Sequence, residues 1–532
     1  MSTFYVTTSI AYTNSKPHAG YAMELAQADC LARYHRLVGD DVYFLTGTDE
    51  HGLKMAQTAR DNGMSVEALA DQNSAEFRRL SKFLNISCDR FIRTTDGFHV
   101  RACQTLWKKL QAADAIYKKT YEGLYCVGCE AYVTEKDLID GKCPNHLKAP
   151  VQFKEENYFF RYSAYLSKIK ELIESDTLKV VPQSRKNEML GLIESGMTDK
   201  RDVSFSRPIE ALSWGIPVPD DDSQAMYVWG DALTNYLSGI GFSAENSENN
   251  QLQQDSNATQ NETQGEHDTA PSAELFTKFW PANVHLIGKD ILRFHAGIWI
   301  AMLMAAELPL PKAIYVHGYI TSEGQKMSKS IGNVVDPFEV GAQFGIDALR
   351  YYLLREIPTT EDGDFNKSRF SALYGGELAN NLGNLVSRVL TMTEKYCSGK
   401  IPAQVREEPI VMKVLETWKD YQAAISEFDL KRALECVFQL LTFANQYIDE
   451  QKPWITAKTE PMKVHACLYN LLEIIRHSSL MLSPFLPDTA KKIQTALNYS
   501  CEKLYPNAIE WGVLKEGTTI TKPEILFPKI EG

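Results

Sequence analysis

The chain has 532 residues, a formal net charge of −12 and an apolar content of 44%. Its length exceeds what one hydrophobic core supports and predicts about two to four domains, and no apolar run reaches the length of a membrane span. The acidic balance argues against a general nucleic-acid binder, which is usually basic, although a selective RNA partner would need only local basic patches.

The first predicted strand covers residues 4–12 and starts without a basic leader or an apolar signal segment, so we expect a cytoplasmic protein. A turn at residues 17–21, with the sequence PHAGY, separates this strand from a helix predicted over 19–38. A strand, a tight turn and a helix start present backbone N–H groups and the positive end of a helix dipole to a phosphate. His18 would act there as a hydrogen-bond donor, although a histidine beside a glycine is more often simply part of a turn.

A second strand is predicted over residues 42–46 and a second helix over 65–84, and this alternation is typical of a parallel sheet. The strand leads into GTDEHG at residues 47–52, which is not part of a dinucleotide-binding fingerprint. Asp49 in this segment lies at the carboxyl end of the strand, where a carboxylate can face the ammonium group of a ligand. The local sequence fits equally well a role for Asp49 as the cap of the next helix.

Four potential zinc ligands, Cys126, Cys129, Cys143 and His146, form two closely spaced pairs separated by thirteen residues. Three thiolates and one imidazole bind zinc tetrahedrally, and because no open fourth position is apparent we expect a structural site. The alternative is a chance grouping of unpaired cysteines. The other seven cysteines are scattered, and we expect buried thiols rather than disulfides.

Residues 226–242 return to the sheet, and Trp229, Ala232 and Tyr236 share one face of a predicted helix start. An aromatic stripe at this spacing is usually part of a core. Residues 243–273 follow, with six acidic residues and no lysine or arginine. We expect a disordered surface insertion there, because such a composition cannot offset its ordering entropy by burial.

A further strand over residues 284–287 leads into Gly288 and Asp290. The helix predicted next places His295 four residues after Ile291, so both side chains can face one pocket.

An apolar run at residues 315–320 predicts another buried strand, and Gly318 and Gly324 bracket a turn beyond it. Two ammonium groups and two hydroxyls then follow on one loop, where they suit phosphate oxygens at the ligand-binding edge of an α/β sheet. The alternative is a solvated basic turn. The loop has the sequence KMSKS and comprises Lys326, Met327, Ser328, Lys329 and Ser330.

From about residue 366 to residue 500 the pattern is helical. Asn384 and Arg388 share the polar face of one predicted helix, and such a face is normally just solvated. Trp454 follows the helix predicted over residues 440–451; if exposed it offers a stacking surface for a base, and if buried it is a core residue.

Together, PHAGY at residues 17–21 and KMSKS at residues 326–330 resemble the HIGH and KMSKS signatures of class I aminoacyl-tRNA synthetases. The surrounding residues narrow the resemblance to the methionyl-tRNA synthetases, and it covers nearly the whole chain. It implies a Rossmann-like α/β catalytic domain on a parallel sheet, with a zinc-binding insertion, followed by an all-α anticodon-binding bundle. The implied domains are residues 1–114 and 226–314 for the two halves of the catalytic domain, 115–225 for the connective insertion with its zinc knuckle, 315–365 for the KMSKS stem-contact module and 366–532 for the α-helical anticodon-binding domain.

The reaction implied by the resemblance is ATP-dependent activation of L-methionine to methionyl adenylate and transfer to tRNA-Met, with Mg²⁺ accompanying ATP. The resemblance assigns ATP binding to Pro17, His18, Gly20, Tyr21, Gly288, Asp290 and the five residues of KMSKS, among which His18, Tyr21, Lys326 and Lys329 would be catalytic. It assigns methionine binding to Ser9, Ile10, Tyr12, Asp49, Trp229, Ala232, Tyr236, Ile291 and His295. Asn384, Arg388 and Trp454 would contact the anticodon.

The chain departs from the family signature at Tyr21, where a second histidine is usual. Tyrosine still donates a hydrogen bond but is neutral and longer, so we expect adenylation to survive with altered efficiency. The rival hypothesis is a catalytically weakened, synthetase-like RNA-binding or regulatory paralogue. Since the chain carries no appended oligonucleotide-binding domain, which dimerises some relatives, we expect a monomer.

Overall fold

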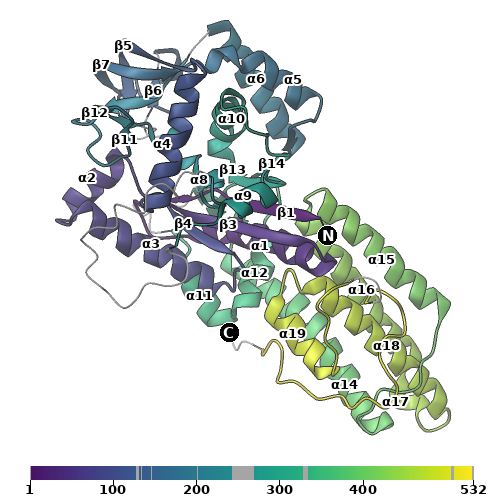
Figure 1. Cartoon of the computed structure of the whole chain (residues 1–532). Helices are drawn as coiled ribbons and strands as arrows, with labels where there is room; N and C mark the ends of the chain where they lie inside the picture. The colour runs from purple at the N-terminus through teal and green to yellow at the C-terminus, as the bar shows by residue number, and fades with distance from the viewer. Residues whose placement is uncertain are drawn as a thin grey trace.

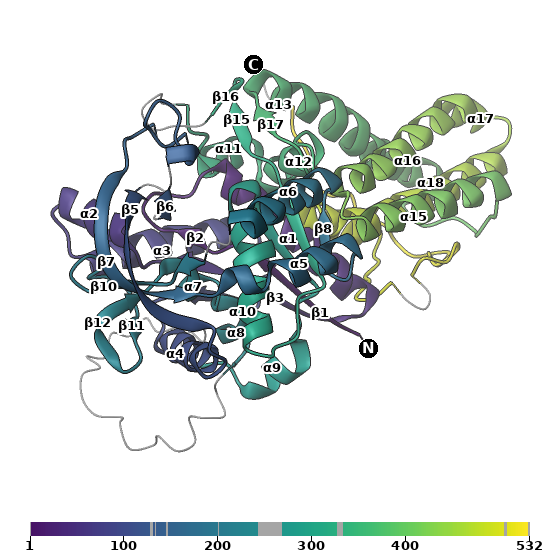
Figure 2. The same cartoon turned by 90° about the horizontal axis from the view of Figure 1, so that it is seen from above.

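A computed structural model describes residues 2–127, 131–133, 135–144, 147–199, 202–242, 269–326, 333–504 and 508–529. A twisted sheet with helices packed around it occupies the centre of the molecule (Figures 1 and 2). A lobe rich in β-structure lies at one end and a bundle of long helices at the other. The α/β catalytic domain and the helical domain predicted from the sequence are therefore both present.

The central sheet is parallel throughout and has the strand order β2-β3-β1-β13-β14-β8, with β4 paired to β3. Its middle strand β1 pairs Val6 with Phe44 on one side and with Val284 on the other. Strands β1, β3 and β13 are almost wholly buried, which explains why their apolar residues follow one another rather than alternate with polar ones. The strands are β1 (Thr3–Thr8), β2 (Ala11–Tyr12), β3 (Asp41–Asp49), β4 (Arg90–Arg93), β8 (Lys179–Val181), β13 (Val284–Gly288) and β14 (Ala313–His317).

Helix α1 (Ala19–Val38) occupies the range predicted for it. His18 is its N-cap, and Gly39 ends it with φ of 97°, a left-handed conformation that glycine adopts without strain. The helix is buried on most of its surface because it lies between the sheet and the helical domain. The other helices of the first half are α2 (Leu53–Asp61), which the sequence reading missed, α3 (Val66–Phe83) and α4 (Gly97–Ala112).

The predicted insertion at residues 115–225 forms most of the β-rich lobe. One antiparallel sheet has the order β6-β5-β7-β9, and a smaller one has the order β10-β12-β11. Strand β8, between two helices of the same segment, pairs with β14 and so belongs to the central sheet. The elements are β5 (Ile116–Cys126), β6 (Ala131–Val133), β7 (Val151–Phe160), α5 (Leu166–Glu174), α6 (Gln183–Asp199), β9 (Val203–Ser204), β10 (Ser206–Pro208), β11 (Pro217–Val218) and β12 (Asp221–Met226).

The second half of the catalytic domain begins with two short helices, α7 (Val228–Ala232) and α8 (Asn235–Ser238), in place of one longer helix. Of the segment predicted to be disordered, residues 243–268 lie outside the described residues. The prediction is wrong for its last five residues: Pro271 is buried, and the Ser272 hydroxyl caps helix α9 (Ala273–Phe279).

The strand predicted over residues 315–320 is wrong as a single strand. Strand β14 ends at His317, and the chain then enters a separate sheet in which β15 (Ile320–Ser322) pairs with β16 (Gln325–Lys326) and β17 (Gly363–Phe365). Gly318 marks the crossing, because a Cβ there would lie 2.1 Å from the carbonyl oxygen of Glu361. This close approach between distant backbones is a tertiary feature that an apolar run does not reveal.

From Lys367 to Ala496 the described chain is mainly helical, as predicted. Its described residues after Ala496 form turns and loops without a helix, so the helical pattern does not continue to the end of the predicted helical domain. Helices α15 (Glu408–Ser426), α16 (Leu430–Gln451) and α18 (Pro461–Leu482) pack against one another and form the body of the bundle. No helix among the described residues combines the length and the apolar character needed to cross a membrane. Apart from short 3-10 turns, the remaining helical segments of the described chain are a π-helix (Phe294–Trp299), α10 (Ile300–Ala305), α11 (Pro337–Phe344), α12 (Ile346–Arg355), α13 (Lys367–Leu373), a second π-helix (Tyr374–Gly383), α14 (Asn384–Cys397), α17 (Pro453–Thr456) and α19 (Pro487–Ala496).

Candidate active site

A cleft of about 860 Å³ opens at the carboxyl ends of the central strands. Ser9 follows β1, Asp49 ends β3, Gly288 ends β13 and His317 ends β14, and all four line the cleft. In an open parallel sheet this edge is where ligands bind, because the turns after the strands leave a crevice there.

The cleft brings together two groups of residues predicted separately from the sequence. Its lining includes five of the residues predicted to bind ATP, His18, Gly20, Tyr21, Gly288 and Asp290. It also includes all nine residues predicted to bind methionine, Ser9, Ile10, Tyr12, Asp49, Trp229, Ala232, Tyr236, Ile291 and His295. Pro17 is buried beside the cleft and does not line it. The backbone of Lys326 ends β16, while its side chain and Met327, Ser328, Lys329 and Ser330 lie outside the described part of the chain.

One end of the cleft is an aromatic pocket without charge. Trp229 stacks on Phe294 with ring centroids 3.8 Å apart. His295 Nδ1 donates to the carbonyl oxygen of Ile291 at 3.0 Å, so its Nε2 is free of a proton and accepts from the hydroxyl of Tyr236 at 2.7 Å. Burial lowers the pKa of His295 to about 4, which keeps the imidazole neutral. The pocket therefore suits an uncharged, polarizable side chain.

Asp49 stands where the aromatic pocket meets the sheet. Its carbonyl oxygen accepts from the backbone N–H of Thr13 at 3.0 Å, which ties the end of β3 to the loop after β2. The N-cap of α2 is Gly52, so the alternative in which Asp49 caps the next helix is wrong. Asp49 also lines the cleft.

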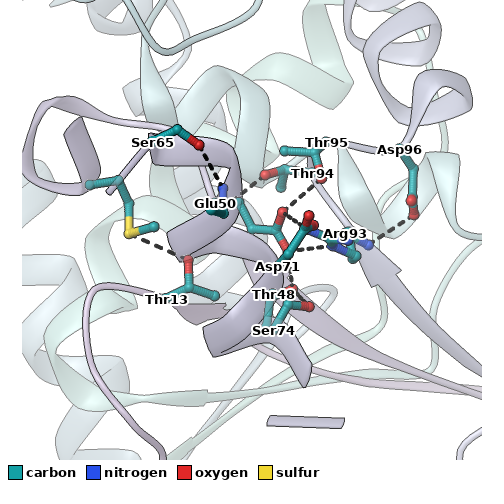
Figure 3. Close-up of polar contacts among 12 residues, drawn as sticks. Thr13, Thr48, Glu50, Ser65, Asp71, Ser74, Arg93, Thr94, Thr95 and Asp96 are labelled. Carbon is teal, nitrogen blue, oxygen red and sulfur yellow. Dashed lines mark hydrogen bonds and ion pairs between the residues drawn. The ribbon is translucent and has the colours of Figure 1, made fainter. Parts of the chain in front are cut away.

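The loop after β3 is held in place by the polar contacts of Glu50 (Figure 3). This carboxylate is fully buried and forms a bidentate pair with Arg93, with N–O distances of 2.8 and 2.9 Å. The hydroxyls of Thr48 and Thr95 also donate to it. A charged group with this many donors has one stable orientation, so the neighbouring Asp49 is held in register with the sheet.

The other end of the cleft contains the start of α1. His18 Nδ1 accepts from the backbone N–H of Gly20 at 3.1 Å, which places the proton of a neutral imidazole on Nε2. The absence of a side chain at Gly20 makes room for this ring, since a Cβ there would lie 2.9 Å from His18 Cε1. His18 is an exposed residue of the open cleft, and the partial desolvation of its ring lowers the pKa of His18, which favours the neutral form.

Tyr21 lines the cleft with its ring, while its hydroxyl has partners inside the protein. The hydroxyl lies 3.1 Å from Thr46 Oγ1 and donates to the carbonyl oxygen of Gly47 at 3.4 Å. The ring packs edge-on against Phe77. A role as a donor to ATP requires that the hydroxyl leave these partners, and that role stays a prediction.

Several residues that line the cleft were not predicted from the sequence, and Glu24 and His317 are the two among them that form an ion pair. Glu24 accepts from both the backbone N–H and the hydroxyl of Ser9 at 2.6 Å, and from His317 Nε2 at 2.9 Å. His317 Nδ1 donates to the carbonyl oxygen of Gly318 at 2.7 Å. Burial opposes its positive charge, but Glu24 outweighs burial and raises the pKa of His317. The only sign of Glu24 in the sequence was that a glutamate occurs in the largely apolar first half of the helix predicted over residues 19–38.

Two family models match this chain. One, described as tRNA synthetases class I (M), matches residues 4–150 and 146–390. The other, described as the anticodon binding domain of methionyl tRNA ligase, matches residues 399–532. The chain belongs to the methionyl-tRNA synthetase family. It is thus a class I enzyme of the ligase type that forms aminoacyl-tRNA.

Individual methionyl-tRNA synthetases resemble it over nearly all of this chain. The methionine–tRNA ligase of Caldanaerobacter subterraneus subsp. tengcongensis is 42% identical over 99% of this chain and 79% of its own. The methionine–tRNA ligase of Brucella suis is 40% identical over 99% of this chain and 98% of its own length. A Mycobacterium tuberculosis methionyl-tRNA synthetase bound by methionyl-adenylate superposes with a TM-score of 0.89 at 37% identity, over 99% of this chain and all of that one. The rival hypothesis of a non-catalytic paralogue gains no support from these relatives.

The zinc site predicted for this methionyl-tRNA synthetase is only partly within the described residues. Cys126 at the end of β5 and Cys143 near the turn at Ile139–Lys142 are both buried. Cys129 and His146 lie outside the described residues. One thiol from each predicted pair is thus withdrawn from water, which fits a structural metal site. Of the seven other cysteines, all free thiols, three are buried as predicted, Cys30, Cys103 and Cys467. The prediction of burial is wrong for the other four, which are half-buried: Cys88, Cys397, Cys436 and Cys501.

The three predicted anticodon contacts lie on the helical domain. Arg388 on α14 forms an ion pair with Asp449 at 2.9 Å, and its guanidinium carbon lies 5.9 Å from the ring centroid of Trp454. Asn384, one helical turn earlier, is exposed. Trp454 is 43% exposed, so the alternative in which it is a core residue is wrong. We name Asn384, Arg388 and Trp454 the bundle-tip surface.

Proposed function

We propose that this chain activates L-methionine with ATP, supplied as its magnesium complex, and transfers the methionyl group to tRNA-Met. The carboxylate of methionine attacks the α-phosphorus of ATP, the bond to the bridging oxygen breaks, and pyrophosphate leaves with the electron pair. A terminal ribose hydroxyl of the tRNA then attacks the carbonyl carbon, and AMP leaves. No covalent bond to the protein forms, so the protein acts by positioning and charge.

One observation carries this proposal: a neutral aromatic pocket, a carboxylate and the start of a helix meet in a single cleft. The pocket of Trp229, Tyr236 and His295 would hold the thioether side chain, and Asp49 would face the ammonium group. One methylene is worth only about 1–3 kcal/mol in an apolar pocket, so the polarizable sulfur against aromatic rings adds needed discrimination.

At the opposite end, neutral His18 would donate through Nε2 to ATP beside the start of α1, where backbone N–H groups favour anions. Gly288 and Asp290 would hold the adenosine. Lys326 and Lys329 would neutralise charge that develops on the phosphates.

Methionine-dependent ATP–pyrophosphate exchange with the purified chain tests this function. We expect wild-type exchange, and for Asp49→Asn a rise in the KM for methionine of about 10- to 100-fold, since a charge-assisted contact is lost. The matched control is Asp61→Asn, an exposed carboxylate at the end of α2, which should behave as wild type. Absence of exchange in the wild type would refute the proposal.

We also propose that Cys126, Cys129, Cys143 and His146 bind one structural zinc ion. The burial of Cys126 and Cys143 supports it, and structural zinc contributes about 10–16 kcal/mol to folding in small sites. We expect one zinc per chain by metal analysis, and faster proteolysis within residues 115–225 after chelation while the helical domain stays resistant. A zinc-free, protease-resistant protein would contradict the site.

The predicted monomer stays a prediction that light scattering can check.

A further inference from the structure

Behind the aromatic wall of the cleft lies a second carboxylate that the proposed function does not use. Asp231 is in α7 between two positions that line the cleft, Trp229 and Ala232, yet it does not line the cleft and is 1% exposed. Its Oδ2 accepts from His51 Nδ1 at 2.7 Å, and its Oδ1 accepts from His99 Nε2 at 2.8 Å.

These contacts join elements that are distant in the sequence. His51 lies in the loop after β3, two residues beyond Asp49. His99 lies in α4, and its Nδ1 pairs with the hydroxyl of Ser238 on α8 at 2.7 Å. The same two short helices, α7 and α8, supply the aromatic side of the cleft. Asp231 therefore links the part of the cleft with Asp49 to the part with the aromatic rings.

The charge of Asp231 is matched inside the protein. Burial opposes the charged carboxylate, but His51 and His99 outweigh burial and lower the pKa of Asp231. Burial likewise opposes a charged imidazole at His51, yet Asp231 raises the pKa of His51. Asp231 and His51 thus form a buried hydrogen-bonded pair in which each group favours the charged form of the other.

A metal site is the other chemistry that these side chains could serve. Ligand atoms of His99, Cys103 and Asp231 lie within 4.8 Å of one another. However, His99 Nε2 lies at hydrogen-bond distance from both Asp231 Oδ1, at 2.8 Å, and Cys103 Sγ, at 3.2 Å. Burial raises the pKa of Cys103, so the sulfur stays a thiol, whereas metals bind thiolates. The geometry favours hydrogen bonds over an ion.

We propose that Asp231, with His51 and His99, is a positioning unit that sets the spacing between Asp49 and the aromatic pocket and thereby sets the affinity for methionine. None of the three side chains lines the cleft. The inference rests on the proposed function of the cleft, because it concerns the binding of that amino acid.

Asp231→Asn removes the charge and keeps the shape. The amide oxygen still accepts from one histidine, and its NH₂ group faces the other. His99 can accept there by moving its proton to Nδ1, where the Ser238 hydroxyl can accept in turn. We expect the variant to fold and to raise the KM for methionine at least about tenfold, since a charge-assisted hydrogen bond is lost, with the KM for ATP within about twofold.

Asp347→Asn is the matched control. Asp347 is a buried carboxylate of α12 that accepts from the backbone N–H of Thr489 and lies away from the cleft. Its substitution should lower the melting temperature and leave the KM for methionine unchanged. If Asp231→Asn fails to fold, Ser238→Ala carries the test: it cuts the far end of the unit, and we expect a smaller rise in the methionine KM alone.

The measurements are exchange kinetics, melting temperature and metal content on the full chain. A methionine KM like that of wild type in both Asp231→Asn and Ser238→Ala overturns the positioning unit. So does an equal rise in the KM for methionine and ATP, which indicates a merely structural role. Loss of one metal equivalent in Asp231→Asn would overturn it in favour of a metal site. Absence of exchange in the wild type refutes the function of the cleft instead.

Discussion

Among the residues of the cleft, Tyr21 has the most distinctive position. It stands where the family signature has a histidine. Its ring lines the cleft, while its hydroxyl contacts Thr46 and Gly47 of β3. The hydroxyl is buried, and burial raises the pKa of Tyr21 far above the usual value, so the group stays protonated. In this arrangement His18, rather than Tyr21, would donate to ATP at the start of α1, as we propose.

Two substitutions separate the ring of Tyr21 from its hydroxyl. Tyr21→Phe keeps the wall, and we expect exchange within about threefold of wild type, because the lost hydrogen bonds go to β3 and cost about 0.5–1.5 kcal/mol of stability. Tyr21→His restores the usual side chain, and we expect equal or faster exchange with a lower melting temperature. A loss in Tyr21→Phe of about a hundredfold would show instead that the hydroxyl is a transition-state donor, which is worth about 2.7–4 kcal/mol.

The residues that could be predicted from the sequence lie in short motifs. His18 and Asp49 each follow a predicted strand, so their place at the edge of a parallel sheet followed from the alternation of elements. Glu24 and His317 could not be found in this way, because their pairing joins positions 293 residues apart. The same holds for Asp231, whose partner His51 is 180 residues distant.

At the scale of elements, the end of β3 is held in place by an ion pair and still lines the cleft through Asp49. Helix α2 starts directly after it, yet the last residues of the strand are held by Glu50 and Arg93 rather than by a helix cap (Figure 3). The Arg93 side chain is 23% exposed and also pairs with Asp71. It therefore lies between the buried Glu50 and the solvent. A run of apolar residues predicts that β3 exists, and the ion pair between Glu50 and Arg93 determines how the end of the strand is oriented.

Arg93→Met tests this loop. It leaves the fully buried Glu50 without its cation, so we expect about 3–5 kcal/mol of lost unfolding free energy and a higher KM for methionine, because Asp49 is no longer held. Adding Glu50→Gln to the same chain should restore most of the stability. Arg79→Met is the control, since its exposed pair with Glu76 is worth less than about 1 kcal/mol. Chemical denaturation gives the comparison; equal losses for Arg93→Met and Arg79→Met would contradict a buried role.

At the scale of the whole molecule, one continuous apolar core extends from α1 into the helical domain. Arg350 of α12 crosses the junction fully buried: it pairs with Asp29 of α1 at 2.8 Å and donates to the carbonyl oxygens of Leu84 and Phe485. The catalytic and helical domains are thus packed as one unit. The sequence predicted the sheet and the helices separately. It did not predict the junction between them, because the junction depends on contacts between side chains that are far apart in the sequence.

Buried histidines make the stability of this unit depend on pH. His285, His295 and His477 are buried and have lowered pKa values, chiefly through desolvation. Their unfolded pKa is about 6.5, so the unfolded chain binds more protons below that value, and stability must fall as the pH drops from about 6.5 toward 4. The raised pKa values of His51 and His317 act in the opposite sense: their contribution is complete below about 6.5 and is lost as the pH rises through the folded-state values.

His295→Gln should flatten the acid side of this profile. With a folded pKa of about 4, His295 accounts for about 3 kcal/mol of the loss between neutral pH and pH 4. Unfolding free energies measured across that range for wild type and variant give the difference. His465→Gln, at a half-buried position of α18, controls for the substitution itself. Identical acid slopes for wild type and His295→Gln would contradict the assignment.

The bundle-tip surface lies on the helical domain at the end farthest from the central sheet, where α17 carries Trp454 (Figure 1). An exposed indole beside the Arg388 guanidinium can stack on an unpaired base, and such stacking is worth about 1–3 kcal/mol per base. We therefore expect Trp454→Ala to raise the KM for tRNA in aminoacylation by about 5- to 150-fold, and to leave methionine-dependent exchange unchanged because the cleft is remote. Met412→Ala, which truncates a 47% exposed side chain on α15, is the matched control and should leave both reactions unchanged. An equal loss of exchange and aminoacylation in Trp454→Ala would mean that the indole supports the fold of the bundle rather than contacting RNA.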